Sequence, residues 1–369
     1  MKIAYVQPRL NSKGGSERVL LLFLKNFSKK HDIDILTSEL DLSSCYDDFK
    51  AYKNNIRVAF SRRIPGNLRY LKSIKSYDLI IASSPAQTVA IRTKIPIIAY
   101  AHSPYRAIRQ EFDLSIFSKN NPLLVFAIPI FAALEKLAFN KCIGIITNSY
   151  FTMKNLDKYN LLPENLPRQV IYPAVEIKAG KPKWKKYFLY ISRIDPTKRQ
   201  HLAIEAFNKV LENNPKYRNF KLILAGHVNN TNYCKYLESI KGPNIEILQN
   251  LSDKQLAVLY KSAYACLFCA KNEDFGITPV EAQSFGKMVL VLGEGGCKET
   301  IIDDKTGFFV KNTDEFSKKI AYLMENPQIL HKAAPNCLKN VRKFSEKAFV
   351  DKFAKILEAF EKDKQTRPW

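Results

Sequence analysis

The segment that decides the fold is YFLYISRIDPTKRQHLAIEAF, residues 187–207. It opens with a β-rich apolar run, Tyr187 to Ser192, and apolar residues then recur at helical spacing from His201 to Phe207. Only a short polar turn separates the two patterns. A buried strand that leads directly into a helix is typical of the parallel sheets of α/β proteins.

The same alternation of short apolar runs and helical patterns extends over the whole chain, which predicts parallel sheets with crossover helices. The strand candidates before the opening segment are Lys2 to Gln7, Asp32 to Thr37, Asp78 to Ser83, Pro96 to Ala101, Gly144 to Thr147 and Gln169 to Tyr172, with helical patterns at Ser16 to Lys30 and Phe131 to Asn140. Those after it are Lys221 to Ala225, Ile245 to Leu248, Ala263 to Phe268, Val289 to Leu292 and Gly307 to Val310.

A chain of 369 residues with 46% hydrophobic residues exceeds the usual size of one hydrophobic core. The pattern breaks at 178–186, where lysines flank Pro182 and apolar periodicity is lost, so this segment is expected to link two domains. We therefore predict two doubly wound, Rossmann-like α/β domains, residues 1–177 and 187–345. The last residues, 346–369, are expected to form a helix that packs back toward the N-terminal domain.

The formal net charge of +23 permits an anionic partner, such as a phosphorylated substrate, an anionic lipid or a nucleic acid. The nucleic-acid alternative is disfavoured, because the basic residues are spread along the chain and no zinc-finger spacing, RNP motif or basic-region heptad is present. The chain shows neither a signal-peptide pattern at Met1 nor an apolar stretch long enough to span a bilayer. We therefore expect a cytoplasmic protein.

No metal site is expected. Cys266 and Cys269 form a C-x-x-C, but no second pair stands at zinc spacing and the segment has the pattern of a core strand. Asp303 and Asp304 precede a turn, and the acids at 32 and 34 alternate within a strand. Neither pair is expected to bind Mg²⁺.

Two cations follow the strand of the opening segment. In a doubly wound sheet, ligands bind beyond the carboxyl ends of the strands. Arg193 can contact phosphate oxygens through two nitrogens, while Lys198 supplies a second positive charge. The spacing therefore favours a diphosphate site; the alternative is a solvated loop that is basic by chance.

A second polar segment, EDFGITPVEA at residues 273–282, follows the strand that ends near Phe268. If Thr278 caps a helix that begins at Pro279, the backbone amides before it can bind hydroxyl groups or phosphate. The same residues also fit a capping box, with Glu281 at its third position. Glu273 has no such structural explanation.

This E-x7-E segment resembles the signature of the family 4 retaining glycosyltransferases, which have the GT-B architecture of two Rossmann-like domains facing a central cleft. Other matching segments follow in the right order and cover most of the chain. They are Gly14 to Arg18, Ile146 to Ser149, Val170 to Pro173, Arg193 with Lys198, and Gly295-Gly296 through Glu299. The chain departs from the family pattern at Gln249-Asn250, where Gly is usual, and at Cys269, where Pro is common.

The resemblance implies a role for each matching residue. Glu281 is expected to hold the donor ribose and Glu273 the donor sugar, with Arg193 and Lys198 on the diphosphate and Gly15 at a helix start near the leaving phosphate. The expected catalytic residues are thus Glu273, His102, Arg193 and Lys198. The expected donor-binding residues are Gly15, Arg193, Lys198, Ser252, Phe275, Gly276, Ile277, Thr278 and Glu281.

The mechanism implied by the resemblance is front-face substitution without a metal or cofactor, in which positive charge on the leaving diphosphate stabilises the transition state. The segment 100–104 with His102, together with 171–175, resembles members that use GDP-mannose; UDP-sugar users share most other motifs. A nucleotide-sugar epimerase, which keeps the same donor contacts, is a rival from another reaction class.

The acceptor is expected at the N-terminal domain, as a glycan or a polyprenyl-linked molecule. A stretch without acidic residues suits an anionic membrane surface or a lipid-linked pyrophosphate, although a solvated basic face explains it equally well. Its basic residues are Lys53, Arg57, Arg62, Arg63, Arg69, Lys72 and Lys75. The apolar segment 122–139 can either dock peripherally at a bilayer or form a buried crossover helix.

Overall fold

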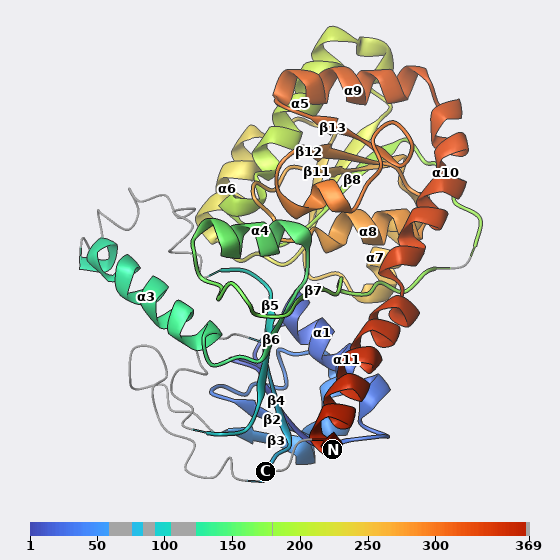
Figure 1. Cartoon of the computed structure of the whole chain (residues 1–369). Helices are drawn as coiled ribbons and strands as arrows, with labels where there is room; N and C mark the ends of the chain where they lie inside the picture. Colours follow the sequence, from blue (N-terminus) through green and yellow to red (C-terminus); the bar gives the residue numbers. More distant parts are fainter. Residues whose placement is uncertain (59–75, 84–92, 105–122, 179, 367–369) are drawn as a thin grey trace. The chain divides into compact units, whose positions relative to one another are not determined.

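The chain folds into two compact units (Figure 1). Unit 1 comprises Met1–Ala174 and Phe349–Trp369, and unit 2 comprises Val175–Ala348. The computed structural model describes residues 1–58, 76–83, 93–104, 123–178 and 180–366. Each unit is built on its own parallel sheet, which confirms the predicted pair of doubly wound α/β domains.

The sheet of unit 1 has seven strands in the order β3-β2-β1-β4-β5-β6-β7, all of whose neighbours run parallel. The order reverses at β1, because later strands add on the other side of it, and this reversal makes the sheet doubly wound. The strands are β1 Lys2–Val6, β2 Asp32–Thr37, β3 Ile56–Val58, β4 Leu79–Ala82, β5 Ile97–Ala101, β6 Gly144–Thr147 and β7 Arg168–Val170.

Helices cover both faces of this sheet. One face, which carries Ile3 and Tyr5, packs on helices α1 and α11, and the other, which carries Ala4 and Val6, packs on α3 and α4. Alternation along β1 explains this division, since neighbouring residues of a strand point to opposite faces. The helical elements are α1 Gly15–Phe27, η1 Asp47–Asn55, α3 Leu123–Phe139, α4 Tyr150–Lys158 and α11 Glu346–Thr366.

The C-terminal helix α11 contributes large apolar side chains to unit 1. Phe349 and Phe353 are buried in the same core as Phe23 of α1, and the rings of Phe23 and Phe353 meet edge to face at 5.3 Å. Burial of aromatic side chains of this size is a dominant source of stability. The C-terminal helix α11 therefore shares one hydrophobic core with the N-terminal helix α1.

Unit 2 has a six-stranded parallel sheet in the order β10-β9-β8-β11-β12-β13, which reverses at β8. The strands are β8 Tyr187–Ile191, β9 Lys221–Ala225, β10 Ile245–Leu248, β11 Ala265–Phe268, β12 Val289–Leu292 and β13 Gly307–Val310. Its α-helices are α5 Gln200–Asn213, α6 Thr231–Ile240, α7 Asp253–Ser262, α8 Ile277–Ser284, α9 Thr313–Glu325 and α10 Gln328–Asn340. Short 3-10 turns are η3 Pro196–Lys198, η4 Pro215–Tyr217, η5 Gly295–Glu299 and η6 Val341–Phe344.

The predicted strands of unit 2 agree closely with the observed ones, and β9, β10, β12 and β13 have the predicted bounds. Larger differences occur in unit 1, where α3 begins at Leu123 although its pattern was expected from Phe131. The strand expected at Gln169 to Tyr172 is β7, which ends at Val170, and the short edge strand β3 was not predicted. Edge strands of three residues carry too little apolar pattern to be recognised.

The segment expected to link the domains makes contacts inside unit 2. The amides of Lys183 and Lys185 donate to carbonyl groups at the end of α7, at 3.0 and 2.9 Å. Lys287 is fully buried, and its ammonium group donates to the Lys183 carbonyl and lies over the Trp184 ring. Burial lowers the pKa of Lys287 to about 8.

Candidate functional site

The loop after β8 carries the two predicted cations, and polar bonds fix its shape. The Asp195 carboxylate accepts from the amide of Thr197 at 3.0 Å and from the side-chain amide of Asn229 at 2.6 Å. Burial acts to raise the pKa of Asp195, but hydrogen bonds from the Thr197 hydroxyl, the Asn229 side chain and the Thr197 amide, together with the charge of Arg193, outweigh it and the pKa is lowered. The buried Gln200 amide donates to the Arg193 carbonyl at 2.8 Å and ties the loop to α5.

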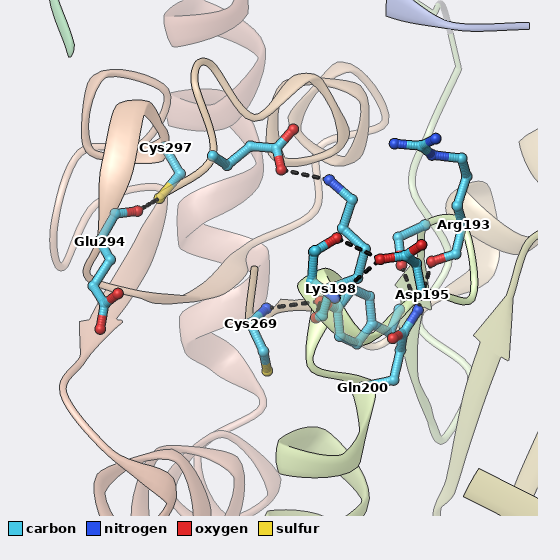
Figure 2. Close-up of polar contacts among 11 residues, drawn as sticks. Arg193, Asp195, Lys198, Gln200, Cys269, Glu294 and Cys297 are labelled. Carbon is cyan, nitrogen blue, oxygen red and sulfur yellow. Dashed lines mark hydrogen bonds and ion pairs between the residues drawn. The ribbon is translucent and has the colours of Figure 1, made fainter. Parts of the chain in front are cut away.

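A side chain of β8 holds the backbone of Lys198 in place. The buried Tyr190 hydroxyl of β8 donates to the Lys198 carbonyl and accepts from the Cys269 amide. The Lys198 ammonium group then forms an ion pair with Glu273, 2.5 Å from Oε2. Figure 2 shows the side chains of Lys198 and the exposed Arg193 extending to the same side of the loop. The predicted diphosphate cation and the predicted sugar carboxylate are therefore in direct contact.

The loop after β12 contacts the backbone of Glu273, and two positions of this loop require glycine. The Gly296 amide donates to the Glu273 carbonyl at 2.6 Å. A Cβ on Gly296 would lie 2.0 Å from the Asp274 carbonyl oxygen, and one on Gly295 would lie 2.6 Å from that of Glu273. Any side chain there would displace the Glu273 backbone. The glycine loop after β12 therefore sets the position of the carboxylate after β11.

The start of α8 differs from the prediction. The helix begins at Ile277 and its N-cap is Gly276, with a φ of 82° and no side-chain cap, so Thr278 lies inside the first turn. The alternative of a capping box of Thr278 with Glu281 is therefore wrong. Gly276 replaces it because the chain enters α8 in a left-handed conformation, which glycine adopts without strain.

Glu281 has a different structural partner, because its Oε2 accepts from the Tyr260 hydroxyl of α7 at 3.1 Å. Phe275 is buried and packs edge to face on Phe344 at 5.5 Å, so its side chain anchors the segment while its backbone leads into α8. Ile277 and Thr278 are the first two helical residues. The amides predicted to assist the donor thus lie at a helix N-terminus, where anions are favoured.

Ser252 caps α7. Its hydroxyl accepts from the Gln255 amide and the Gln255 side chain accepts from the Ser252 amide, which is a complete capping box. The sequence Ser252 to Gln255 has the S-x-x-Q pattern of this motif, although Ser252 was predicted only as a donor-binding residue. A structural role therefore accounts for the Ser252 side chain without a ligand.

One pair near the site was not predicted. Arg199 has a φ of 54°, and its guanidinium group lies 4.0 Å from the carboxylate of Glu294, next to the glycine loop. Nη1 of Arg199 and Oε2 of Glu294 are buried and make no hydrogen bond within the part of the chain that the structure describes. A positive φ at a residue other than Gly or Asn is uncommon, and sequence patterns give no signal for it.

In unit 1, Gly15 is the first residue of α1 and Gly14 is its N-cap. A Cβ on Gly15 would meet no atom within 4 Å, so packing does not demand glycine there. Next to it, the Gln7 amide at the end of β1 donates to the Ser16 hydroxyl at 3.3 Å. This contact holds the start of α1 at the carboxyl end of the sheet.

His102 lies directly after β5, at the same edge. Its Nε2 is 3.1 Å from the Ser83 hydroxyl that follows β4, and its carbonyl accepts from the Asn148 side chain at 2.9 Å. Burial lowers the pKa of His102 to about 4, because the charged ring is poorly solvated there. The imidazole is therefore neutral near pH 7 and acts through hydrogen bonds.

Apart from Ser252, which follows the edge strand β10, the predicted residues gather at two strand-end clusters, one in each unit. Lys198, Glu273 and the start of α8 follow β8 and β11, which are neighbours in the sheet of unit 2. Gly15 and His102 follow β1 and β5 of unit 1, with β4 between them. Within the described residues, no group of three or more potential metal ligands is present. All seven cysteines are free and buried.

Two family descriptions match adjoining parts of the chain. "Glycosyltransferase Family 4" matches residues 13–178, and "Glycosyl transferases group 1" matches residues 174–344. The chain belongs to the family 4 glycosyltransferases. The matched ranges contain every predicted site residue, and the chain is accordingly an enzyme that transfers a sugar.

Among curated relatives, the alpha-1,3/1,6-mannosyltransferase ALG2 of Saccharomyces cerevisiae is 25% identical over 448 residues, covering 100% of this chain and 86% of the relative. ALG2 of Dictyostelium discoideum is 23% identical, covering 97% of this chain and 98% of the relative. These alignments span both units.

Solved structures agree on the fold. HepE of Anabaena in complex with UDP-glucose superposes with a TM-score of 0.75 at 18% identity, covering 97% of this chain and 100% of that one. A glycosyltransferase from Rickettsia africae superposes with a TM-score of 0.73 at 19% identity, covering 98% of each chain. The two Rossmann-like sheets are therefore those of the GT-B architecture.

Proposed function

We propose that this glycosyltransferase moves mannose, with retention of configuration, from GDP-mannose to a glycan or polyprenyl-linked acceptor. The alpha-1,3/1,6-mannosyltransferases to which the chain is similar along their length support the choice of sugar. A UDP-sugar donor is the second candidate, since a structure of similar fold was solved with UDP-glucose. The acceptor is proposed at unit 1.

The observation that carries the proposal is the ion pair between Lys198 and Glu273, 2.5 Å apart at the ends of neighbouring strands. A donor has an anionic diphosphate directly attached to a neutral, hydroxyl-rich sugar. A site for it needs a cation and a hydrogen-bond acceptor side by side, and this pair supplies both. Arg193, exposed on the same loop, adds the second cation.

In the proposed mechanism, the acceptor hydroxyl attacks the anomeric carbon on the face that the diphosphate leaves. The leaving phosphate oxygen takes the acceptor proton, while Lys198 and Arg193 stabilise the growing negative charge. Arg193 and Lys198 supply positive charge that a metal would otherwise bring, and the family resemblance assigns Gly15, at the N-terminal end of α1, a place near the leaving phosphate. The neutral His102 is assigned a hydrogen bond to the donor sugar.

We place the enzyme in the cytoplasm, in peripheral contact with an anionic membrane that presents the acceptor. Of the basic residues that suggested this contact, Arg62, Arg63, Arg69, Lys72 and Lys75 lie outside the described residues. Arg57 is described, and it pairs with Asp34 at 3.3 Å. This ion pair gives Arg57 a structural role, and Lys53 lies in η1.

The test is a donor screen of the purified protein with GDP-sugars and UDP-sugars, EDTA, and a detergent-solubilised polyprenyl-linked acceptor. Transfer of mannose from GDP-mannose, with full activity in EDTA, is the expected result. Transfer only from UDP-sugars would replace the donor assignment. Isomerised donor in the absence of acceptor would indicate an epimerase. Nucleic-acid binding that is lost at moderate salt, together with no response to nucleoside diphosphates, would indicate a nucleic-acid-binding protein.

A further inference from the structure

Helix α3, Leu123–Phe139, has a composition that is unusual for a helix with a solvent-facing side. Its sequence LLVFAIPIFAALEKLAF contains only two charged residues, Glu135 and Lys136. Helices that are apolar on almost every side are normally buried. At 17 residues, α3 is also shorter than a membrane span, and no helix among the described residues has the length and apolar character to cross a bilayer.

The exposed side chains of α3 that the structure describes, all of which lie between residues 129 and 137, are apolar. Ile130 is 61% exposed and Leu137 is 52% exposed, and they stand seven residues apart, two turns along one face. Pro129 and Ala133, on the same side, are also exposed. We call Pro129, Ile130, Ala133 and Leu137 the α3 apolar face. Figure 1 shows α3 projecting from unit 1 on the side of the sheet opposite α1 and α11.

The charged residues of α3 are arranged so that the acid is buried and the basic residues lie near the apolar face, which favours contact with an anionic surface. Glu135, the only acid between residues 123 and 143, is 3% exposed and lies on the buried side with Ala138 and Phe139. Lys136 is half-buried at the border of the apolar face, and Lys141 is exposed just after the helix. Basic residues at the edge of an apolar helical face, with no exposed acid, are typical of helices that lie in a membrane interface.

We propose that the α3 apolar face docks this enzyme on an anionic membrane surface, with the helix lying in the interface. The inference rests on the proposed function in one respect, since a lipid-linked acceptor gives the enzyme a reason to be there. A second copy of the chain is a weaker candidate, because two chains of net charge +23 repel each other whereas anionic lipids attract them.

The experiment is flotation of the purified full chain with vesicles of phosphatidylcholine, with and without about 30% phosphatidylglycerol. The variant is Ile130→Ser with Leu137→Ser, which removes apolar surface and keeps the charge. The matched control is Val258→Ser, since Val258 of α7 in unit 2 is 64% exposed. Wild type and control are expected to float with anionic vesicles, and the double variant is expected to lose at least about fivefold in bound fraction.

Further measurements separate this proposal from its rivals and from the proposed function. Thermal unfolding and nucleoside diphosphate binding in solution, both expected unchanged, show that the double variant is folded and its donor site intact. Equal flotation of the double variant and wild type would overturn the proposal, as would absence of wild-type binding. A wild-type dimer that the variant breaks, without any vesicle effect, would assign the face to a second copy. If the protein binds vesicles but has no mannosyltransferase activity, the proposed docking by the α3 apolar face stands and only the proposed function is wrong.

Discussion

The two strand-end clusters occupy the same place in two similar sheets, yet their chemistry differs. In unit 2 Lys198 forms an ion pair with Glu273, whereas in unit 1 the neutral His102 is bonded to Ser83. An anionic diphosphate needs compensating charge, whereas a hydroxyl nucleophile and a sugar need directed hydrogen bonds. In the proposed function, the side chains of unit 2 therefore hold the charged diphosphate, whereas the His102 side chain of unit 1 contacts a neutral group of the donor.

The largest effect is expected at the strand-end cluster of unit 2. Lys198→Ala should lower turnover about a hundredfold or more, because it removes a donor that stabilises the leaving charge and leaves Glu273 without its ion pair. Arg193→Ala should act in the same direction. The control is Lys209→Ala on α5, whose exposed pair with Asp314 should contribute almost nothing. Near-normal kcat in a protein lacking both Arg193 and Lys198 would remove the centre of the mechanism.

The two glutamates of the E-x7-E segment should differ. Glu281→Gln should weaken nucleoside diphosphate binding about tenfold to a hundredfold, since it removes a charged acceptor of ribose hydroxyl groups. Stability should hardly change, because Gln still accepts from the Tyr260 hydroxyl. Glu273→Gln should leave that binding near normal and depress turnover. Calorimetry and kinetics on both variants test the contrast. If Glu281→Gln binds nucleoside diphosphate and turns over as wild type does, Glu281 has no role beyond its contact with Tyr260.

The neutral state of His102 should make the stability of the protein depend on pH. The pKa of His102 is lowered from 6.5 to about 4, so the unfolded chain binds more protons between these values and stability falls as the pH drops through that window. The loss should be about 2 kcal/mol after allowance for partial exposure. Urea unfolding of wild type and His102→Asn at pH 7 and pH 4.5 measures it, because other groups titrate equally in both. Parallel pH dependence of the two proteins would contradict the assignment.

A smaller effect is expected at the start of α1. Gly15→Ala should leave stability unchanged or slightly higher, because the added Cβ meets no atom within 4 Å and Ala favours helix. Turnover should fall about tenfold if a methyl group there crowds the leaving phosphate. Thermal unfolding and steady-state kinetics separate the two effects. Unchanged kinetics would show that Gly15 is an ordinary helix start.

The smallest effect is expected at Ser252. Ser252→Ala removes the capping hydroxyl of α7 and should lower the free energy of unfolding by about 1 kcal/mol. If Ser252 also binds the donor nucleoside, the Kd for nucleoside diphosphate should rise as well. Ser252→Asp keeps a cap and serves as the control. A change in stability without a change in Kd would remove Ser252 from the donor site.

Much of the fold was predictable because parallel strands buried on both faces are continuous apolar runs, as in β9 and β13. The C-terminal helix and the paired sheets follow from the same periodicity. The candidate site was predictable in composition, because Arg193, Lys198 and Glu273 lie in loops that follow strands, and such loops converge at one edge of a sheet. The helix start at Gly276 was missed because Thr278-Pro279 is the stronger local signal.

The sequence by itself determined which residues follow which strands, and thereby which functional groups each unit presents. Only the tertiary structure decided their partners: Glu273 with Lys198 across 75 positions of sequence, and the Glu273 backbone with the glycines at 295 and 296. It also turned Glu135 of α3 inward and left Ile130 exposed. The physical reason is that periodicity is a local property of a segment, whereas contacts and burial depend on which segments the fold brings together.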